Sequence, residues 1–251
     1  MRRNAPDASE AELRRELADC YRLFAHLGWD EAIFNHITLR LPGPERHYLI
    51  NPFGLAYEEV TPDNLVKIDL AGDPVAPTPY RVNPAGFIIH SAIHAAREDA
   101  HCIMHVHTTD GIAVACKASG LSHDNFYGAQ FHGRVAYHDF EGISVHPEEQ
   151  PRLVQSLGDK DVLILRNHGL LVLGPDVPTA FRWMWTLQRA CEVQCRSAAL
   201  PGADTVLSPA VQRQSTADAM AFAGGTTARL LFDALVRRME RVCAARQRKS
   251  P

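Results

Sequence analysis

The chain has 251 residues, of which 46% are hydrophobic and 22% charged, and its formal net charge at pH 7 is -3. This charge gives no electrostatic reason to expect a nucleic acid or an anionic membrane as a partner. No apolar run approaches the ~20 residues of a membrane span, and residues 1–6 lead into acidic, helical sequence instead of a signal-peptide core, so we expect a cytoplasmic protein.

The spacing of hydrophobic residues and the positions of Gly, Pro and Asn predict a mixture of helices and strands. We expect helices at 9–27, 84–97, 109–118, 147–157, 178–200 and 210–242, the last divided near Gly224 and Gly225. We expect strands at 36–41, 48–51, 65–70, 102–107, 135–140, 162–165 and 170–173. Ser9 and Glu12 predict a capping box on the first helix, and Thr109 or Asp110 is the expected cap of the third. With no linker or repeat, residues 1–251 are expected to form a single α/β domain.

Two histidines on the predicted strand 102–107 are candidate metal ligands. His105 and His107 are two residues apart, and side chains at that spacing project from the same face of a strand. His168 lies in a turn after the apolar run 162–165, which reads as a buried strand. Three neutral imidazoles binding at ~2.0–2.1 Å would leave an open position on a catalytic ion. The alternative, histidines without a metal, is disfavoured because both segments are apolar and an unpartnered buried histidine is costly.

Several short stretches, in this order and spacing, resemble a known family. They are Phe34-Asn35-His36-Ile37-Thr38-Leu39-Arg40, Leu49-Ile50-Asn51-Pro52-Phe53-Gly54, Asn83-Pro84-Ala85-Gly86-Phe87 through His94, the His-x-His strand, Arg134-Val135-Ala136-Tyr137-His138-Asp139 and Arg166-Asn167-His168-Gly169. Residues from about 10 to 200 are similar to the class II aldolase/adducin family, and the residues in several of these stretches resemble those of its adducin-like bacterial branch. Residues 201–251 are then a helical C-terminal extension.

The resemblance implies a three-layer α/β/α fold with a mostly antiparallel central sheet. It also implies a homotetramer with active sites between subunits, and a divalent metal held by His105, His107 and His168. We expect Zn²⁺, with Fe²⁺ or Mn²⁺ as alternatives. In the aldolases the metal stabilises an enediolate formed when a carbon–carbon bond breaks, and a tyrosine of the neighbouring subunit protonates the leaving aldehyde. Tyr137 falls at the position of that tyrosine.

The chain departs from the sugar-phosphate aldolases at their general base. Gly86 stands where those enzymes have a glutamate, so Gly86→Glu is expected to restore some base function. His90, one helical turn further on, and Glu141, which follows the Tyr137 strand, are the candidate replacements. The alternatives are a hydrogen-bonded structural histidine for His90 and an exposed loop residue for Glu141. His36 and His132 are weaker candidates.

The residues that hold a substrate phosphate in those aldolases are also changed. Two serines correspond to Pro84 and Ala85, and a loop glycine corresponds to Phe34. Asn35 and Gly54 are retained, and together with Gly86 they are the expected substrate-binding positions. The substrate is therefore expected to be a small molecule without a phosphate group.

Three functions remain open from the sequence. The favoured one is a metal-dependent lyase that cleaves or forms a carbon–carbon bond, or decarboxylates, next to a carbonyl. The second is a non-haem iron(II) oxygenase acting on an aromatic hydroxy acid in secondary metabolism, because some members of this fold hold iron on three histidines and have no use for the glutamate. The third is a non-enzymatic interaction module like the adducin head. It is disfavoured because animal adducins lack the metal histidines, which this chain retains.

Overall fold

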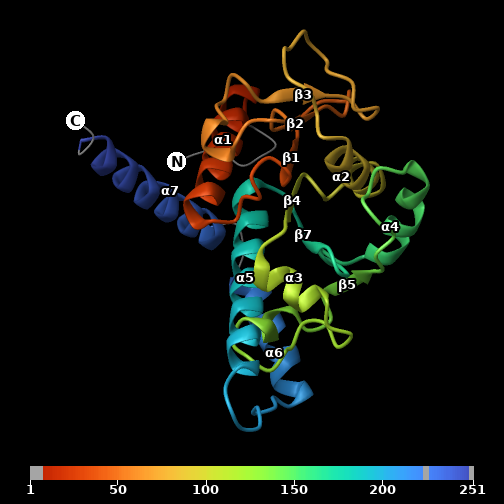
Figure 1. The fold of residues 1–251 in the computed structure, drawn as a ribbon, viewed down its shortest axis with the longest axis vertical. Coiled ribbons are helices and arrows are strands. Elements are labelled where there is room, and N and C mark those ends of the chain that lie inside the picture. The colour runs from red at the N-terminus through yellow and green to blue at the C-terminus, as the bar shows by residue number, and fades with distance from the viewer. Residues whose placement is uncertain (1–7, 223–225, 249–251) are drawn as a thin grey trace.

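The computed structural model describes residues 8–222 and 226–248, without the side chains of Ala85 and residues 246 and 247 (Figure 1). The expectations for residues 1–6 and for a helix break at Gly224 and Gly225 lie outside the described residues. Within them, no single helix is long and apolar enough to cross a membrane. The helices Pro209–Phe222 and Thr226–Ala245 are together long and apolar enough to cross a membrane, by length and composition alone, but they form a pair that is bent by 74°.

A mixed sheet forms the middle layer of the described residues, with seven strands in the order β3-β2-β1-β4-β7-β6-β5. The strands are β1 (His36–Arg40), β2 (Tyr48–Ile50), β3 (Val66–Ile68), β4 (Cys102–Val106), β5 (Val135–His138), β6 (Val162–Leu165) and β7 (Gly169–Gly174). All neighbouring pairs are antiparallel except β5 and β6, which run parallel. The expected mostly antiparallel sheet is therefore confirmed.

Helices cover both faces of the sheet (Figure 1). They are α1 (Glu10–Leu27), α2 (Pro84–Ala96), α3 (Thr109–Ala115), α4 (Gln150–Leu157), α5 (Val177–Ala198), α6 (Pro209–Phe222) and α7 (Thr226–Gln247). On one face, α1, α5 and α7 bury a core that includes Met104 and Val172 of the sheet. On the other face, α2 and α4 pack on Ile103 and Leu171. The three-layer α/β/α architecture is confirmed, and α6 and α7 are the helices of the C-terminal extension.

The pairing of β1 with β4 decides which side chains face α2. His36 lies opposite His105 in this antiparallel register. Since successive side chains of a strand point to opposite faces, Ile37 and Met104 join the core under α1 and α5, while His36 and His105 project toward α2. Tyr21 of α1 fixes the beginning of β1, because its hydroxyl donates to the Ile37 carbonyl and accepts from the Ile37 amide.

Helix caps follow the sequence prediction at α1 but not at α3. The Ser9 side chain accepts from the Glu12 amide and the Glu12 carboxylate accepts from the Ser9 amide, so the predicted capping box is confirmed. Helix α3 begins at Thr109 with Thr108 as its N-cap residue, so the prediction that Thr109 or Asp110 is the cap is wrong. The Thr108 hydroxyl makes no capping bond, because it donates to a glutamine of α5.

Short 3-10 helices account for the other differences from the predicted elements. They are η2 (Tyr57–Glu59), η3 (Gly128–Phe131) and η4 (Pro147–Glu149). The predicted helix 147–157 divides into η4 and α4, and a proline at the start of each lacks the amide proton that a continuous helix would use. Hydrophobic spacing does not predict such single turns, because they are too short to show a periodicity.

Candidate metal centre

Three histidines from neighbouring strands meet at one point. His105 lies on β4, His107 follows that strand, and His168 lies in the turn between β6 and β7. The Nε2 atom of His107 is 2.8 Å from that of His105 and 3.0 Å from that of His168, and the Nε2 atoms of His105 and His168 are 3.3 Å apart. In residues 8–222 and 226–248 no other three His, Cys, Asp or Glu side chains converge in this way.

The β6–β7 turn brings the third histidine into place through two unusual backbone positions. Asn167 has a φ of 56°, in the left-handed region that asparagine tolerates better than most residues. Gly169 leaves no room for a side chain, because an added Cβ would lie 2.5 Å from the Val106 carbonyl oxygen and 3.1 Å from Cδ2 of His107. Glycine therefore allows β7 to approach β4 directly beneath the histidines.

The three imidazoles present lone pairs to one another. His105 Nδ1 is 2.9 Å from the Leu170 carbonyl oxygen, which can only accept, so Nδ1 carries the proton and Nε2 the lone pair. Burial, together with His168 and His107, holds the pKa of His105 well below its ordinary value. Burial also lowers the pKa of His107, and it lowers the pKa of His168 to about 4. At neutral pH all three are therefore neutral, which is the form that binds a metal.

The spacing of the three nitrogens fits a single divalent ion. Two nitrogens bound at ~2.1 Å lie about 3.0 Å apart when the angle at the ion is a right angle and about 3.4 Å apart when it is tetrahedral. The separations here are 2.8, 3.0 and 3.3 Å. A centre with three protein ligands keeps open positions for a substrate, as catalytic metal sites do.

A fourth histidine lies against this cluster. The rings of His36 and His105 have centroids 5.0 Å apart across the β1–β4 pair. A Cβ added to Gly86 would be 2.6 Å from Cδ2 of His36 and 3.1 Å from its Nε2. The His36 ring thus fills the space that a side chain at position 86 would need. Gly86→Glu therefore restores a base only if the His36 ring moves, and its effect stays a prediction.

His90, predicted as a candidate base, lies behind His36 instead of at the histidine cluster. It is 1% exposed, and its Nε2 is 3.1 Å from His36 Nδ1. Sequence reasoning ranked His36 too low, because only the register between β1 and β4 brings it beside His105. The local signal for it is weak: position 36 follows the retained Asn35 and shares a strand face with Thr38.

Comparison with known proteins agrees with this fold. The sequence profile of the Class II Aldolase and Adducin N-terminal domain matches residues 15–195. The chain belongs to the class II aldolase and adducin family. Membership in this class II aldolase family supports, in general terms, a metal-dependent lyase of the aldolase type.

Three relatives illustrate the range of this family. The crystal structure of an aldolase II superfamily protein from Pseudomonas syringae matches with a TM-score of 0.89 and 42% identity, over 94% of this chain and 96% of that one. L-fuculose 1-phosphate aldolase from Glaciozyma antarctica PI12 matches with a TM-score of 0.83 and 27% identity, over 98% and 95% of the two chains. Alpha-adducin from Rattus norvegicus is 48% identical over 201 residues, which are 79% of this chain and 27% of the adducin.

Tyr137, the expected counterpart of the aldolase tyrosine, lies on the edge strand β5. Its hydroxyl accepts a hydrogen bond from the Leu121 amide at 3.0 Å. The Arg166 guanidinium carbon is 4.6 Å from the centre of its ring, which is a cation–π distance. These contacts hold the ring between the β6–β7 turn and the loop before η3.

The second predicted base, Glu141, is already paired. Its Oε1 accepts from Nε of Arg152 at 2.8 Å, and this hydrogen bond lowers the pKa of the Glu141 carboxyl. It also lies 3.7 Å from Nε2 of His138. His138, the last residue of β5, is buried beside α4, with Nδ1 3.0 Å from Ser156 Oγ and Nε2 3.4 Å from Glu149 Oε1. It is buried because α4 packs over the end of β5.

Asn35 and Gly54, two of the expected substrate-binding positions, differ in their surroundings. Asn35 is buried, with its amide donating to the Trp29 carbonyl at 2.9 Å. Its Oδ1 is buried without a hydrogen-bond partner among the described residues. Gly54 has a φ of 102° and nothing within 4 Å of an added Cβ. Phe34 exposes 54% of its surface in the place of the aldolase glycine.

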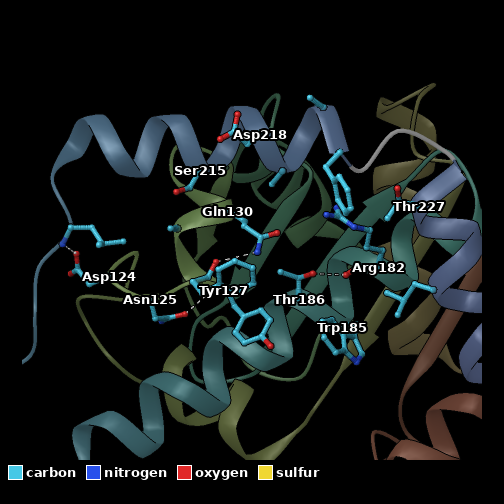
Figure 2. Close-up of a pocket in the computed structure, with 17 residues that line it drawn as sticks. Asp124, Asn125, Tyr127, Gln130, Arg182, Trp185, Thr186, Ser215, Asp218 and Thr227 are labelled. Atoms are coloured by element: carbon cyan, nitrogen blue, oxygen red, sulfur yellow. Dashed lines mark hydrogen bonds between the residues drawn. The ribbon is translucent and has the colours of Figure 1, made fainter.

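A large cavity lies apart from the histidines, between the loop before η3 and helices α5 and α6. Its volume is about 1040 Å³, and Tyr127, Arg182 and Trp185 line it (Figure 2). None of the three clustered histidines contributes to its wall. Burial lowers the pKa of Arg182, whose guanidinium lies 4.4 Å from the Trp183 ring centre. The histidine cluster, which lies outside this cavity, is therefore the candidate catalytic centre.

Proposed function

We propose that this protein is a metal-dependent lyase that breaks or forms a carbon–carbon bond, or removes a carboxyl group, next to the carbonyl of a small substrate. The observation that carries the proposal is the convergence of three neutral imidazole nitrogens within 3.3 Å of one another. His105, His107 and His168 would hold Zn²⁺, with Fe²⁺ or Mn²⁺ as alternatives. The bound ion would supply Lewis-acid polarisation of a carbonyl oxygen.

Tyr137 is the proposed proton donor to the leaving aldehyde, acting in the site of a neighbouring subunit of a homotetramer. Its hydroxyl oxygen accepts from the Leu121 amide, which leaves the hydroxyl proton free for donation to a substrate. Light scattering of the intact protein tests the assembly. A stable monomer at micromolar concentration would remove the reason for assigning Tyr137 this role.

The proposed reaction also requires a residue that accepts a proton. Glu141 and His90 remain the candidates from sequence, and the contacts of both argue for other tasks. The carboxylate of Glu141 is held by Arg152, and His90 is buried behind His36. A direct role for either residue would require its present hydrogen bonds to break.

We propose a substrate without a phosphate group. Support comes from Phe34, whose exposed ring replaces a loop glycine of the sugar-phosphate aldolases, and from Pro84, which has no amide proton to offer. Asn35 and Gly54 remain as substrate-binding positions, and the buried, unpartnered Oδ1 of Asn35 is a free acceptor there.

A second candidate is a non-haem iron(II) oxygenase or decarboxylase acting on an aromatic hydroxy acid. The observation that favours it is the set of nitrogen separations, two of which, 2.8 and 3.0 Å, are close to those of ligands at right angles. Three neutral ligands on one face of an octahedral ion leave three positions for a substrate and an oxidant. Iron(II) with open positions of this kind is used by oxygenases.

A third candidate is a non-enzymatic interaction module. The identity of 48% with rat alpha-adducin over 201 residues supports it. The histidine cluster argues against it, because a protein without catalytic chemistry has no use for three neutral imidazoles, one buried and two half-buried, that face one another.

Metal analysis after anaerobic purification separates the three candidates. The lyase predicts ~1 Zn²⁺ or Mn²⁺ per chain, the oxygenase predicts iron, and the interaction module predicts no metal under non-chelating conditions. The variants His105→Ala, His107→Ala and His168→Ala should each lose most of the metal while keeping their circular dichroism spectra. His146→Ala, at an exposed histidine, is the matched control and should keep its metal.

A further inference from the structure

A line of buried hydrogen-bonding groups, which we term the histidine chain, runs from His36 to the backbone before β4. His36 Nδ1 is 3.1 Å from His90 Nε2, and His90 Nδ1 is 2.8 Å from Thr38 Oγ1. Thr38 Oγ1 is 2.7 Å from His94 Nε2, and His94 Nδ1 is 2.8 Å from the Ala100 carbonyl oxygen. All five residues are at most 2% exposed, so solvent does not compete for these bonds.

The carbonyl at the far end fixes the direction of every bond in the histidine chain. The Ala100 oxygen can only accept, so His94 Nδ1 donates to it and His94 Nε2 is left as an acceptor. The Thr38 hydroxyl therefore donates to His94 and accepts from His90 Nδ1. His90 Nε2 is then an acceptor, so His36 Nδ1 donates to it. This places the proton of His36 on Nδ1 and the lone pair on Nε2.

These hydrogen-bond directions require that each imidazole ring of the histidine chain is neutral and carries one proton. Burial of the rings favours this neutral form. Burial holds the pKa of His90 well below its ordinary value, and it lowers the pKa of His94 to about 3. Arg40 donates to the His94 carbonyl, which holds the end of α2 against the sheet.

The lone pair of His36 lies beside position 86, the expected counterpart of the glutamate of the sugar-phosphate aldolases. A Cβ at position 86 would be 3.1 Å from His36 Nε2, so a side chain leaving position 86 would run into this atom. His36 is also the cross-strand neighbour of His105. The missing carboxylate and the added imidazole therefore share one region beside the metal ligands.

We propose that His36 is a substrate-binding residue of this centre, where its Nε2 accepts a hydrogen bond from a hydroxyl group of the substrate. The substrate class is a compound with a hydroxyl next to a carbonyl or carboxylate. Thr38, His90 and His94 are positioning residues that hold His36 in the accepting tautomer. The inference rests on the proposed function, because the metal centre must hold the rest of the substrate.

The tautomer of His36 is measured by NMR of the intact protein labelled with ¹⁵N-histidine, since ring nitrogens with and without a proton differ widely in chemical shift. The signal is assigned by its loss in His36→Phe. We expect a protonated Nδ1 in wild type, a mixture of tautomers in Thr38→Val, and recovery of the wild-type pattern in Thr38→Ser, which keeps the hydroxyl. A protonated Nε2 in wild type overturns the inference.

The substrate contact is measured by binding of glycolate and acetate to the Zn²⁺-loaded protein, because the two anions differ in one hydroxyl. The preference for glycolate should fall about fivefold in His36→Phe, with the Zn²⁺ content unchanged. His146→Phe, at an exposed position, should keep the wild-type preference. An unchanged preference in His36→Phe overturns the substrate role. A wild type that binds none of Zn²⁺, Fe²⁺ and Mn²⁺ would sink the proposed function and the substrate role with it, while the NMR result still decides the tautomer.

Discussion

Gly86 lacks a side chain because the His36 ring occupies the space, so Gly86→Ala should destabilise the protein. Alanine in a helix is normally more stable than glycine by up to ~1 kcal/mol. Here the new Cβ would lie 2.6 and 2.7 Å from Cδ2 and Cγ of His36. That ring has little freedom to move, because it is hydrogen-bonded to His90 and lies beside His105. Overpacking costs ~1–3 kcal/mol, so the net loss should be up to ~2 kcal/mol.

When the His36 ring is removed, Gly86→Ala should stabilise the protein instead of destabilising it. In a His36→Ala background the space is open, and Gly86→Ala should stabilise the protein by up to ~1 kcal/mol. The difference between the two backgrounds, ~1–3 kcal/mol, is the coupling energy of a double-mutant cycle. Urea unfolding of wild type, the two single variants and the double variant measures it, at one protein concentration and with a chelator present so that metal binding adds nothing.

The control for this cycle is Gly86→Ala in a His146→Ala background, where the exposed histidine is removed and the loss should match that in wild type. Equal stabilisation by Gly86→Ala in the wild-type and His36→Ala backgrounds would falsify the packing of His36 against Gly86. The placement of the His36 lone pair beside position 86 would then lose its geometric basis as well.

Three further outcomes are expected. Gly169→Ala places a Cβ 2.5 Å from the Val106 carbonyl oxygen and should reduce metal affinity ~10–100-fold in a chelator competition assay; unchanged affinity would contradict the close approach of β7. Between pH 6.5 and 3 the unfolded chain protonates His94 while the folded protein, where the pKa of His94 is about 3, does not. His94 should therefore contribute a loss of ~1.4 kcal/mol per unit as the pH drops in the metal-free protein, in addition to the loss from the other buried histidines, and His94→Gln should reduce the slope in urea unfolding by that amount. Cleavage of fuculose- or rhamnulose-type sugar phosphates in a coupled assay should be ~10²–10⁴-fold slower than by a working sugar-phosphate aldolase, and equal rates would show that Gly86 is misread.

The features that the sequence predicts well are local ones. His105 and His107 are neighbours on one strand face, and His168 lies in a turn directly after an apolar strand, so their convergence follows from alternation and one antiparallel pairing. The capping box at Ser9 and Glu12 is equally local. The His-x-His pair and the capping box are visible in a single sequence because their members are at most three positions apart, and His168 is recognisable by the apolar strand that directly precedes it.

The features that the sequence misses depend on tertiary packing. His36 reaches the site only through the register of β1 on β4, and no pattern near position 36 reports that register. His138 lies in the predicted strand 135–140, but its burial depends on α4 folding over β5, which the strand pattern alone does not predict. The pairing of Glu141 with Arg152 likewise joins two segments that have no common periodicity.

The register of the central strands also limits where this chain can change in length. His36, His105 and Leu171 lie in line across β1, β4 and β7, each strand hydrogen-bonded to the next. One inserted or deleted residue in β1 or β4 would turn every later side chain of that strand to the opposite face and carry a histidine away from α2. Insertions and deletions should therefore be tolerated only in connections such as 41–47, 69–83 and 199–208, where a longer loop costs little and moves no histidine.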